Sequence, residues 1–378
     1  MKKLRVGIVG FGFIGPHHLD AIRRLGFAEV TGIATVSEQD ARRQAERYHI
    51  SNHYASWRQL VADPAIDVVD VATPTNLHAP VALAAIAAGK HVIVDKPMAL
   101  NTREAKKMHD AARRAGVVNA VTFSIRYNVM LQQARAMIAR GAVGDIRVAT
   151  GHYWQEWLTK ETDFNWRLDP KQGGALGMIS DAGAHWYDMV QHVTGRRIVR
   201  VLADFSRFIP VRQRPVGGGK TVDYRVRVPD FGIILCELDN GARGLFSTGA
   251  ISAGHKNDLT LEVCGSRASV RWQQERPDEL WVGRRDEPNQ TWIKDPPLLD
   301  PSVRSLAALP GGHYEAWPDA FRNLMRNILG FIAEGRDPRE ADGATFPTFA
   351  TGLGIARIVD AIAASAKAGG KWKPVARS

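Results

Sequence analysis

Residues 4–15 read LRVGIVGFGFIG, a short apolar run that leads into a G-x-G-x-x-G motif. The run is rich in β-branched residues, as expected of a strand buried on both faces, and the helical pattern HLDAIRRLG follows at 18–26. Glycines with this spacing allow a tight turn, close approach of the backbone to a pyrophosphate, and close packing of helix on strand. The N-terminus of the helix would supply N–H donors to the phosphates. The stretch therefore predicts a dinucleotide site that includes Gly10, Gly12, Phe13, Ile14 and Gly15.

The next cofactor position lies about 20 residues beyond the motif, where a carboxylate binds the adenosine ribose in NAD-selective proteins. Counting from Gly15 leads to Thr35, and no arginine stands in the next few positions. Arg42 and Arg43 are more distant candidates for contact with a 2′-phosphate. We therefore expect NAD or NADP as cofactor, with Thr35 at the ribose and NADP accepted alongside NAD.

Residues 1–124 continue to alternate β-branched apolar runs with amphipathic helical patterns. The helical stretch at 101–116 has Asn101 or Thr102 as its expected N-cap and Gly116 as its expected C-cap. This βαβαβ order predicts an α/β fold that begins with a doubly wound parallel sheet, the Rossmann arrangement.

After Phe123 the pattern changes, and long alternating stretches such as 146–154 and 258–265 predict a second α/β domain, 125–378, with a large, mainly antiparallel sheet. The Gly/Pro-rich, basic stretch RQRPVGGGKTVDY at 212–224 is expected to form a surface loop. Its GKT is not a P-loop, because Arg214 stands where that motif requires glycine.

Composition limits the classes of partner. The 378 residues are 45% hydrophobic and 24% charged, as is typical of globular proteins, and no run approaches 18 uninterrupted apolar residues, so we expect no membrane span. The two cysteines indicate a reducing compartment, and we expect a cytoplasmic protein. The net charge of +11 is scattered rather than clustered, so we expect anionic ligands and no nucleic acid.

Two stretches carry the expected chemistry. Lys96, in Asp95-Lys96-Pro97, follows a strand whose carboxyl end should border the ligand crevice, and the proline limits the conformations of the lysine backbone. Asp181, His185 and Asp188 have the spacing i, i+4 and i+7, which places them on one face if the segment is helical. A histidine suits the base of a hydride-transfer enzyme. The alternative is that Asp181 caps the helix and His185 is a half-buried structural residue. A metal site is not expected, because one histidine and two aspartates at this spacing match no known zinc or di-metal pattern.

The chain resembles the glucose-fructose oxidoreductase and inositol dehydrogenase (Gfo/Idh/MocA) family over nearly its full length. The resemblance rests on GFGFIG at 10–15, ATPTNLH at 72–78, AGKHVIVDKP at 88–97, RYNVMLQQARAMIARGAVGDI at 126–146 and GGALGMISDAGAHWYDM at 173–189. It implies a Rossmann domain followed by an α/β domain whose open sheet commonly mediates oligomerisation, here as a homodimer or homotetramer. It also implies a nicotinamide dinucleotide as cofactor.

The resemblance also implies roles for residues. Lys96 matches the lysine of the family's Glu-Lys-Pro motif, with Asp95 in place of the usual Glu, and Asp181 and His185 match its Asp-x-x-x-His pair at the reacting sugar hydroxyl. The family segment that passes beneath the nicotinamide ribose corresponds here to Thr73, Pro74, Asn76 and His78. The family residues near the substrate correspond to Arg126, Tyr127 and His313.

The substrate class that the resemblance implies is a sugar, a polyol or a derivative of one. Trp154, Trp166 and Arg167 would suit a pyranose ring. The alternative is that the tryptophans are core or interface residues. The expected reaction is hydride transfer from a hydroxyl-bearing carbon to NAD(P). The alternatives are cleavage or epimerisation through a transient keto-sugar with retained cofactor, and a non-catalytic nucleotide-binding regulator; the latter should have lost Lys96 or His185.

Overall fold

The structure, a computed structural model, describes residues 3–341, 343 and 345–376. The chain divides into two compact units. Unit 1 comprises Met1–Ser124 and Pro318–Ala356, and unit 2 comprises Ile125–Trp317 and Arg357–Ser378. Each unit is described separately below.

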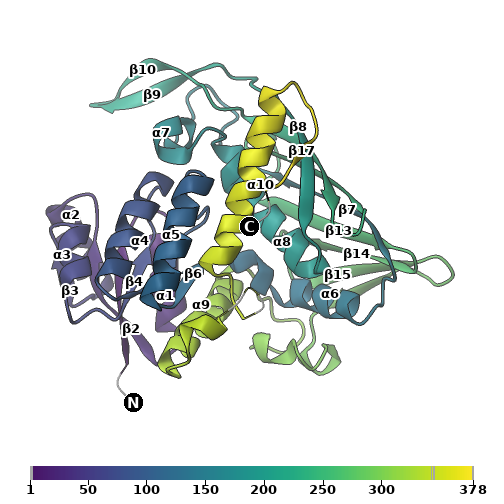
Figure 1. Ribbon diagram of the computed structural model, residues 1–378, viewed down its shortest axis with the longest axis horizontal. Helices are drawn as coiled ribbons and strands as arrows, with labels where there is room; N and C mark the ends of the chain where they lie inside the picture. Colours follow the sequence, from purple (N-terminus) through teal and green to yellow (C-terminus); the bar gives the residue numbers. More distant parts are fainter. Residues whose placement is uncertain (1–2, 342, 344, 377–378) are drawn as a thin grey trace. The chain divides into compact units, whose positions relative to one another are not determined.

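Unit 1 contains the predicted parallel sheet, with six strands in the order β3-β2-β1-β4-β5-β6 (Figure 1). The central strands are apolar on both faces, and Val6, Ile8, Val68 and Val71 are fully buried. The strands are β1 (Leu4–Val9), β2 (Ala28–Ala34), β3 (Asn52–Tyr54), β4 (Val68–Val71), β5 (His91–Val94) and β6 (Asn119–Val121), and the helices are α1 (Gly15–Arg23), α2 (Glu38–Tyr48), α3 (Trp57–Ala62), α4 (His78–Ala87) and α5 (Thr102–Ala115).

Local sequence signals set the ends of α5 as predicted. Asn101 is the N-cap, and its side chain accepts a hydrogen bond from the N–H of Glu104. Gly116 ends the helix in the left-handed conformation, at φ 62°.

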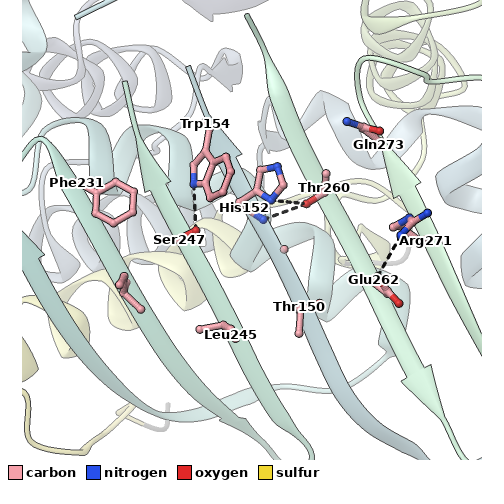
Figure 2. Close-up of a pocket in the computed structure, with 12 residues that line it drawn as sticks. Thr150, His152, Trp154, Phe231, Leu245, Ser247, Thr260, Glu262, Arg271 and Gln273 are labelled. Atoms are coloured by element: carbon pink, nitrogen blue, oxygen red, sulfur yellow. Dashed lines mark hydrogen bonds and ion pairs between the residues drawn. The ribbon is translucent and has the colours of Figure 1, made fainter. Parts of the chain in front are cut away.

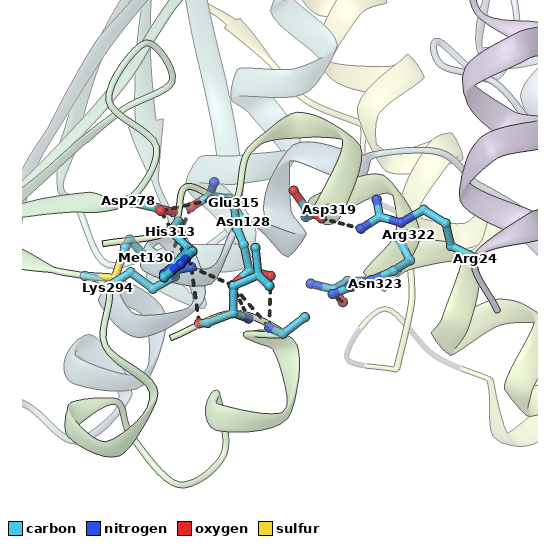
Figure 3. Close-up of polar contacts among 12 residues, drawn as sticks. Arg24, Asn128, Met130, Asp278, Lys294, His313, Glu315, Asp319, Arg322 and Asn323 are labelled. Carbon is cyan, nitrogen blue, oxygen red and sulfur yellow. Dashed lines mark hydrogen bonds and ion pairs between the residues drawn. The ribbon is translucent and has the colours of Figure 1, made fainter. Parts of the chain in front are cut away.

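The segment after residue 317 differs from the prediction of one continuous second domain, 125–378. Helix α9 (Trp317–Ala333) and the chain that follows it group with unit 1. The N–H of Val121 donates to the carbonyl of Pro347 at 2.8 Å, so this segment continues the hydrogen bonding of β6. Arg24 and Asp319 also form an ion pair at 2.6 Å (Figure 3). The contacts that hold the segment are long-range, which is why the local pattern did not reveal them.

Unit 2 contains a nine-stranded sheet in the order β16-β15-β14-β13-β7-β12-β11-β8-β17, antiparallel except for the β7–β12 pair. This confirms the predicted mainly antiparallel sheet. Its strands are β7 (Ile146–Trp154), β8 (Ile198–Ser206), β11 (Phe231–Leu238), β12 (Arg243–Gly249), β13 (Asp258–Gly265), β14 (Ala268–Gln273), β15 (Glu279–Arg284), β16 (Gln290–Ile293) and β17 (Lys373–Pro374).

Helices α6 (Val129–Ala139) and α8 (Met178–Thr194) pack against one face of this sheet, and short α7 (Pro170–Gly173) precedes α8 (Figure 1). Trp186 of α8 is fully buried and stacks on Phe246 of β12, with ring centroids 4.7 Å apart. A Cβ at Gly151 would lie 2.3 Å from Nε1 of Trp186, so only glycine fits there. This packing decides which side chains of β7 face α8.

The stretch at 212–224 is not the loop that we predicted, although it is mostly exposed. It forms a two-stranded hairpin of β9 (Val211–Gly217) and β10 (Lys220–Arg225), with Arg212 paired to Tyr224. Gly217, Gly218 and Gly219 all have positive φ and form the turn. The glycines that suggested a loop mark only the turn between two strands.

Helix α10 (Phe349–Lys367) is long and apolar enough to cross a membrane by length and composition alone. At its start, the N–H of Phe349 donates to Oδ1 of Asn119 in unit 1. Near its end, Ser365 is fully buried and its hydroxyl accepts from the N–H of Ala203 in unit 2. Both ends are therefore bonded to folded parts of the chain, as in a core helix.

Candidate active site

The glycine motif forms the expected cradle between β1 and α1. Gly10 has φ 93°, and a Cβ there would lie 2.6 Å from the carbonyl oxygen of Ala72. A Cβ at Gly15 would lie 2.7 Å from the carbonyl oxygen of Gly10, so this glycine allows α1 to pack closely on the turn. Gly12 instead faces open space, and Phe13 is 84% exposed. The surface above the N-terminus of α1 thus has the open, glycine-lined form that a pyrophosphate requires.

The segment 73–78 follows the carboxyl end of β4 and forms the 3-10 turn η1 (Thr75–Leu77). Oγ1 of Thr73 and Oδ1 of Asn76 are buried and make no hydrogen bond within the described part of the chain. Buried polar atoms are normally satisfied, so these two atoms fit a bound ligand with hydroxyl or amide groups, such as a nicotinamide riboside. Pro74 precedes the turn and is half-buried.

His78 is buried between the two predicted functional segments. Its Nε2 lies 2.8 Å from the carbonyl oxygen of Thr73, and its Nδ1 lies 3.0 Å from that of Pro97. Burial lowers the pKa of His78 and favours the neutral ring, which donates to only one of the two carbonyls. His78 therefore connects the segment at 73–78 to the turn that carries Lys96.

Lys96 is half-buried and follows β5, as predicted, with a cis peptide bond to Pro97. Asp95, in place of the family's Glu, accepts a hydrogen bond from Thr122 at 2.5 Å. Its Oδ1 also lies 3.9 Å from Nε2 of His18, and Nδ1 of His18 lies 2.8 Å from Asp70. Burial opposes the charged form of His18, but the two carboxylates outweigh it and raise its pKa. The shorter carboxylate of Asp95 thus keeps a hydrogen-bond donor, Thr122, and lies close to the ring of His18.

Sequence reasoning overlooked His18 and Asp70. The signal was present, since His18 stands three residues beyond Gly15 on the first turn of α1, and Asp70 interrupts the apolar strand β4. A buried carboxylate normally needs a charged or hydrogen-bonding partner.

Thr35 directly follows β2, the position that we predicted, and it is half-buried; its contact with the adenosine ribose stays a prediction. Its hydroxyl donates to the carbonyl of Ser37 at 3.0 Å. Thr35 and the paired Arg43 lower the pKa of Asp40, a carboxyl in the first turn of α2. A carboxylate therefore stands close to Thr35, but Arg43 offsets its charge.

In unit 2, Asp181 and His185 lie on α8, which confirms the predicted helix. The N-cap is Gly177, so Asp181 is not the capping residue that the alternative reading required. Oδ2 of Asp181 lies 2.9 Å from Nε of Arg167, and both residues are largely buried. His185 is 7% exposed, one turn further along the same face.

Asp188, the third residue of this face, forms a buried ion pair. Arg126, from the 3-10 turn η2 (Ser124–Tyr127), donates through Nε to Oδ2 of Asp188 at 2.8 Å and through Nη2 to Oδ1. The two side chains are 4% and 2% exposed. The expected substrate contact Arg126 therefore has a carboxylate partner within unit 2, and neighbouring Tyr127 is buried as well.

Alternation along β7 corrects the assignment of Trp154. Trp154 stacks on His152 at 4.0 Å and donates to Ser247, on the sheet face opposite to α8 (Figure 2). The ring beside His185 is instead that of Tyr153, at 6.2 Å between centroids. Its hydroxyl donates to Asn257, and burial, assisted by Asp181, raises its pKa. Successive side chains of a strand point to opposite faces, and this alternation along β7 would have placed Tyr153, rather than Trp154, on the side of His185.

Trp166 and Arg167 form the 3-10 turn η3 (Trp166–Leu168), and the guanidinium of Arg167 lies 4.3 Å from the centroid of the Trp166 ring. Arg167 therefore touches both an aromatic face and Asp181.

His313 is exposed, and what the structure shows of its environment is a backbone contact. Its carbonyl accepts from Nζ of the buried Lys294, which also binds Glu315 at 2.6 Å (Figure 3). The predicted role of the His313 side chain stays a prediction.

The six-stranded parallel sheet and the glycine cradle between β1 and α1 are those of a dinucleotide-binding Rossmann fold. Residues 4–123 match the model of the oxidoreductase family with an NAD-binding Rossmann fold, and residues 131–271 match the GFO/IDH/MocA C-terminal domain. The chain belongs to the Gfo/Idh/MocA family of NAD(P)-binding oxidoreductases. The prediction of family, fold and nicotinamide dinucleotide cofactor is confirmed.

Several relatives act on sugars or polyols. The chain is 30% identical to levoglucosan dehydrogenase of Pseudarthrobacter phenanthrenivorans, over 97% of each chain. It is 25% identical to myo-inositol 2-dehydrogenase of Thermotoga maritima, over 71% of this chain and 74% of that one. A structure of levoglucosan dehydrogenase with NADH and L-sorbose matches with a TM-score of 0.91 at 30% identity, over 100% of both chains.

Proposed function

We propose that this protein is an NAD(P)-dependent dehydrogenase that oxidises a hydroxyl-bearing carbon of a sugar, a polyol or a derivative of one. The observation that carries the proposal is the Asp181–His185 pair on α8, with Arg167 bound to Asp181, in a chain whose first unit has a complete glycine cradle. The names of the levoglucosan and inositol dehydrogenases support the substrate class.

In this proposal His185 takes the proton of the reacting hydroxyl, because an imidazole accepts a proton near neutral pH. The ammonium group of Lys96 polarises the same oxygen and stabilises its developing negative charge. Asp181, held by Arg167, accepts a hydrogen bond from a neighbouring hydroxyl and orients the ring. The nicotinamide ring of NAD(P) supplies the hydride acceptor, and Thr73 and Asn76 would hold its ribose.

The test is a screen of the purified protein with NAD and NADP against levoglucosan, inositols, monosaccharides, sugar phosphates and acid sugars. Reduction of the nicotinamide, followed by absorbance, with at least one of these compounds is the expected result. Conversion of a glycoside without net cofactor reduction would instead establish the transient keto-sugar reaction.

We predict that the wild-type protein accepts both cofactors, with kcat/KM values for NAD and NADP within about 100-fold, or roughly 3 kcal/mol. Thr35 can hydrogen-bond a hydroxyl or a phosphate but cannot repel one, and the nearby Asp40 is paired with Arg43. Thr35→Asp should therefore raise the KM for NADP far more than that for NAD. Steady-state kinetics with both cofactors measures this, and exclusion of NADP by the wild type would contradict our assignment of Thr35.

We further propose that the sheet face opposite to α8 associates with a second copy of the chain. Exposed apolar side chains cluster on this face, with Leu245 paired to Leu235 and Ile233 and Val148 nearby. Large exposed apolar patches usually mark interfaces. Sedimentation should show an oligomer that Leu245→Arg dissociates, whereas Val222→Arg, on the exposed hairpin, should not dissociate it. A monomeric wild type would contradict this proposal.

A further inference from the structure

The β9–β10 hairpin extends away from the nine-stranded sheet of unit 2 (Figure 1). Most of its residues are exposed, and Val216 and Val222 remain about half-exposed. A lone two-stranded hairpin is only marginally stable in water. Contacts at its base must therefore hold it in place.

Arg212 is the main contact, and it is fully buried. Its Nη1 donates to the carbonyls of Lys160 and Asp163 at 2.8 and 3.2 Å, and its Nη2 donates to the carbonyl of Leu158 at 2.7 Å. A guanidinium presents several donors in a fixed plane, so one side chain can bind three main-chain carbonyls at once. Arg212 therefore fixes the conformation of the turn at 158–163.

The second strand of the hairpin binds the other end of the same segment. The hydroxyl of Tyr224 donates to the carbonyl of Leu168 at 3.3 Å, and its ring packs edge-on against Phe164 at 5.1 Å. The N–H of Gln213 also donates to the carbonyl of Glu161 at 2.8 Å. The hairpin thus holds the segment 158–168 at both ends, through residues 158–164 and through Leu168.

This segment ends at Trp166 and Arg167, and Arg167 binds Asp181 at 2.9 Å. The backbone of Arg167 is enclosed on its other side, because Cβ atoms at Gly173 and Gly177 would lie 2.9 and 2.7 Å from its atoms. The backbone of Arg167 thus has little room to adjust, and a shift of the segment 158–168 would move its guanidinium away from Asp181.

We propose that Arg212 is a positioning residue for the substrate site: through it, the β9–β10 hairpin holds the segment 158–168 so that Arg167 keeps Asp181 oriented toward the sugar. The inference rests on the proposed function for its last step. Its first step, the hold of the hairpin on the segment, is independent of any activity.

The experiment compares Arg212→Met and Arg212→Lys with Lys220→Met, a matched control at the exposed tip of the same hairpin. Hydrogen–deuterium exchange followed by mass spectrometry should show amide exchange at 158–168 faster by at least about tenfold in Arg212→Met, because the segment loses the three hydrogen bonds that hold its conformation. Exchange in β8 should be unchanged. Arg212→Lys, with one ammonium for three carbonyls, should be intermediate, and it serves as the test if Arg212→Met does not fold.

Kinetics supply the second readout. The KM for the sugar should rise by about tenfold or more in Arg212→Met and by an intermediate factor in Arg212→Lys, while in both variants the dissociation constant of the dinucleotide stays within about twofold of that of wild type. Unchanged exchange at 158–168, or faster exchange with an unchanged sugar KM, would overturn the inference. A wild type that oxidises no sugar would instead overturn the proposed function and with it the last step, while the exchange data would still decide the first.

Discussion

Lys96→Met and His185→Ala are each expected to lower turnover by at least about 100-fold while leaving dinucleotide binding largely intact, because proton transfer and oxyanion stabilisation typically contribute that much. Neither residue belongs to the glycine cradle that the cofactor requires. Steady-state rates and binding of NAD, followed by fluorescence or calorimetry, measure the two effects separately.

The double variant sharpens this prediction. Since both side chains are proposed to act on one oxygen, their losses should be strongly non-additive. Lys107→Met and His53→Ala are matched controls at exposed positions, and both should behave like wild type. A rate near that of wild type for either Lys96→Met or His185→Ala would refute the catalytic assignment.

Local signals predicted much of the fold because they act over a few residues. The glycine spacing, the β-branched runs and the cap at Asn101 each act within one turn or one strand. The grouping of residues 318–356 with unit 1 depends on contacts such as the hydrogen bond from Val121 to Pro347, which join residues more than 200 positions apart. No periodic pattern contains that information.

The candidate site was likewise predictable only where local motifs determine it. Motif spacing predicted Lys96, Asp181 and His185 as site residues, and their catalytic roles stay predictions; α8 has the helical form that the spacing required. The density of tryptophans led us to place Trp154 near the substrate, but density does not say which face of β7 a side chain occupies. The partners of buried charges, such as Asp70 for His18, required the tertiary structure.

Asp188→Ala is expected to have the largest effect on stability. It would leave the guanidinium of Arg126 buried without its carboxylate, and breaking a buried ion pair in this way costs about 3–5 kcal/mol. Urea unfolding of the variant should show a lower midpoint with little change in slope. Asp188→Asn, which keeps an acceptor for one of the two hydrogen bonds, should lose less.

The same pair separates two roles of Arg126. If Arg126 serves mainly as the partner of Asp188, replacing both residues together, as in Arg126→Met with Asp188→Leu, should recover much of the stability that Asp188→Ala loses, because apolar side chains of similar volume can replace a buried ion pair. If Arg126 also binds substrate, as the family resemblance implies, this stable double variant should still have a raised sugar KM. A sugar KM equal to that of wild type in the folded double variant would show that Arg126 has only a structural role. A raised KM would indicate that Arg126 also contacts the substrate.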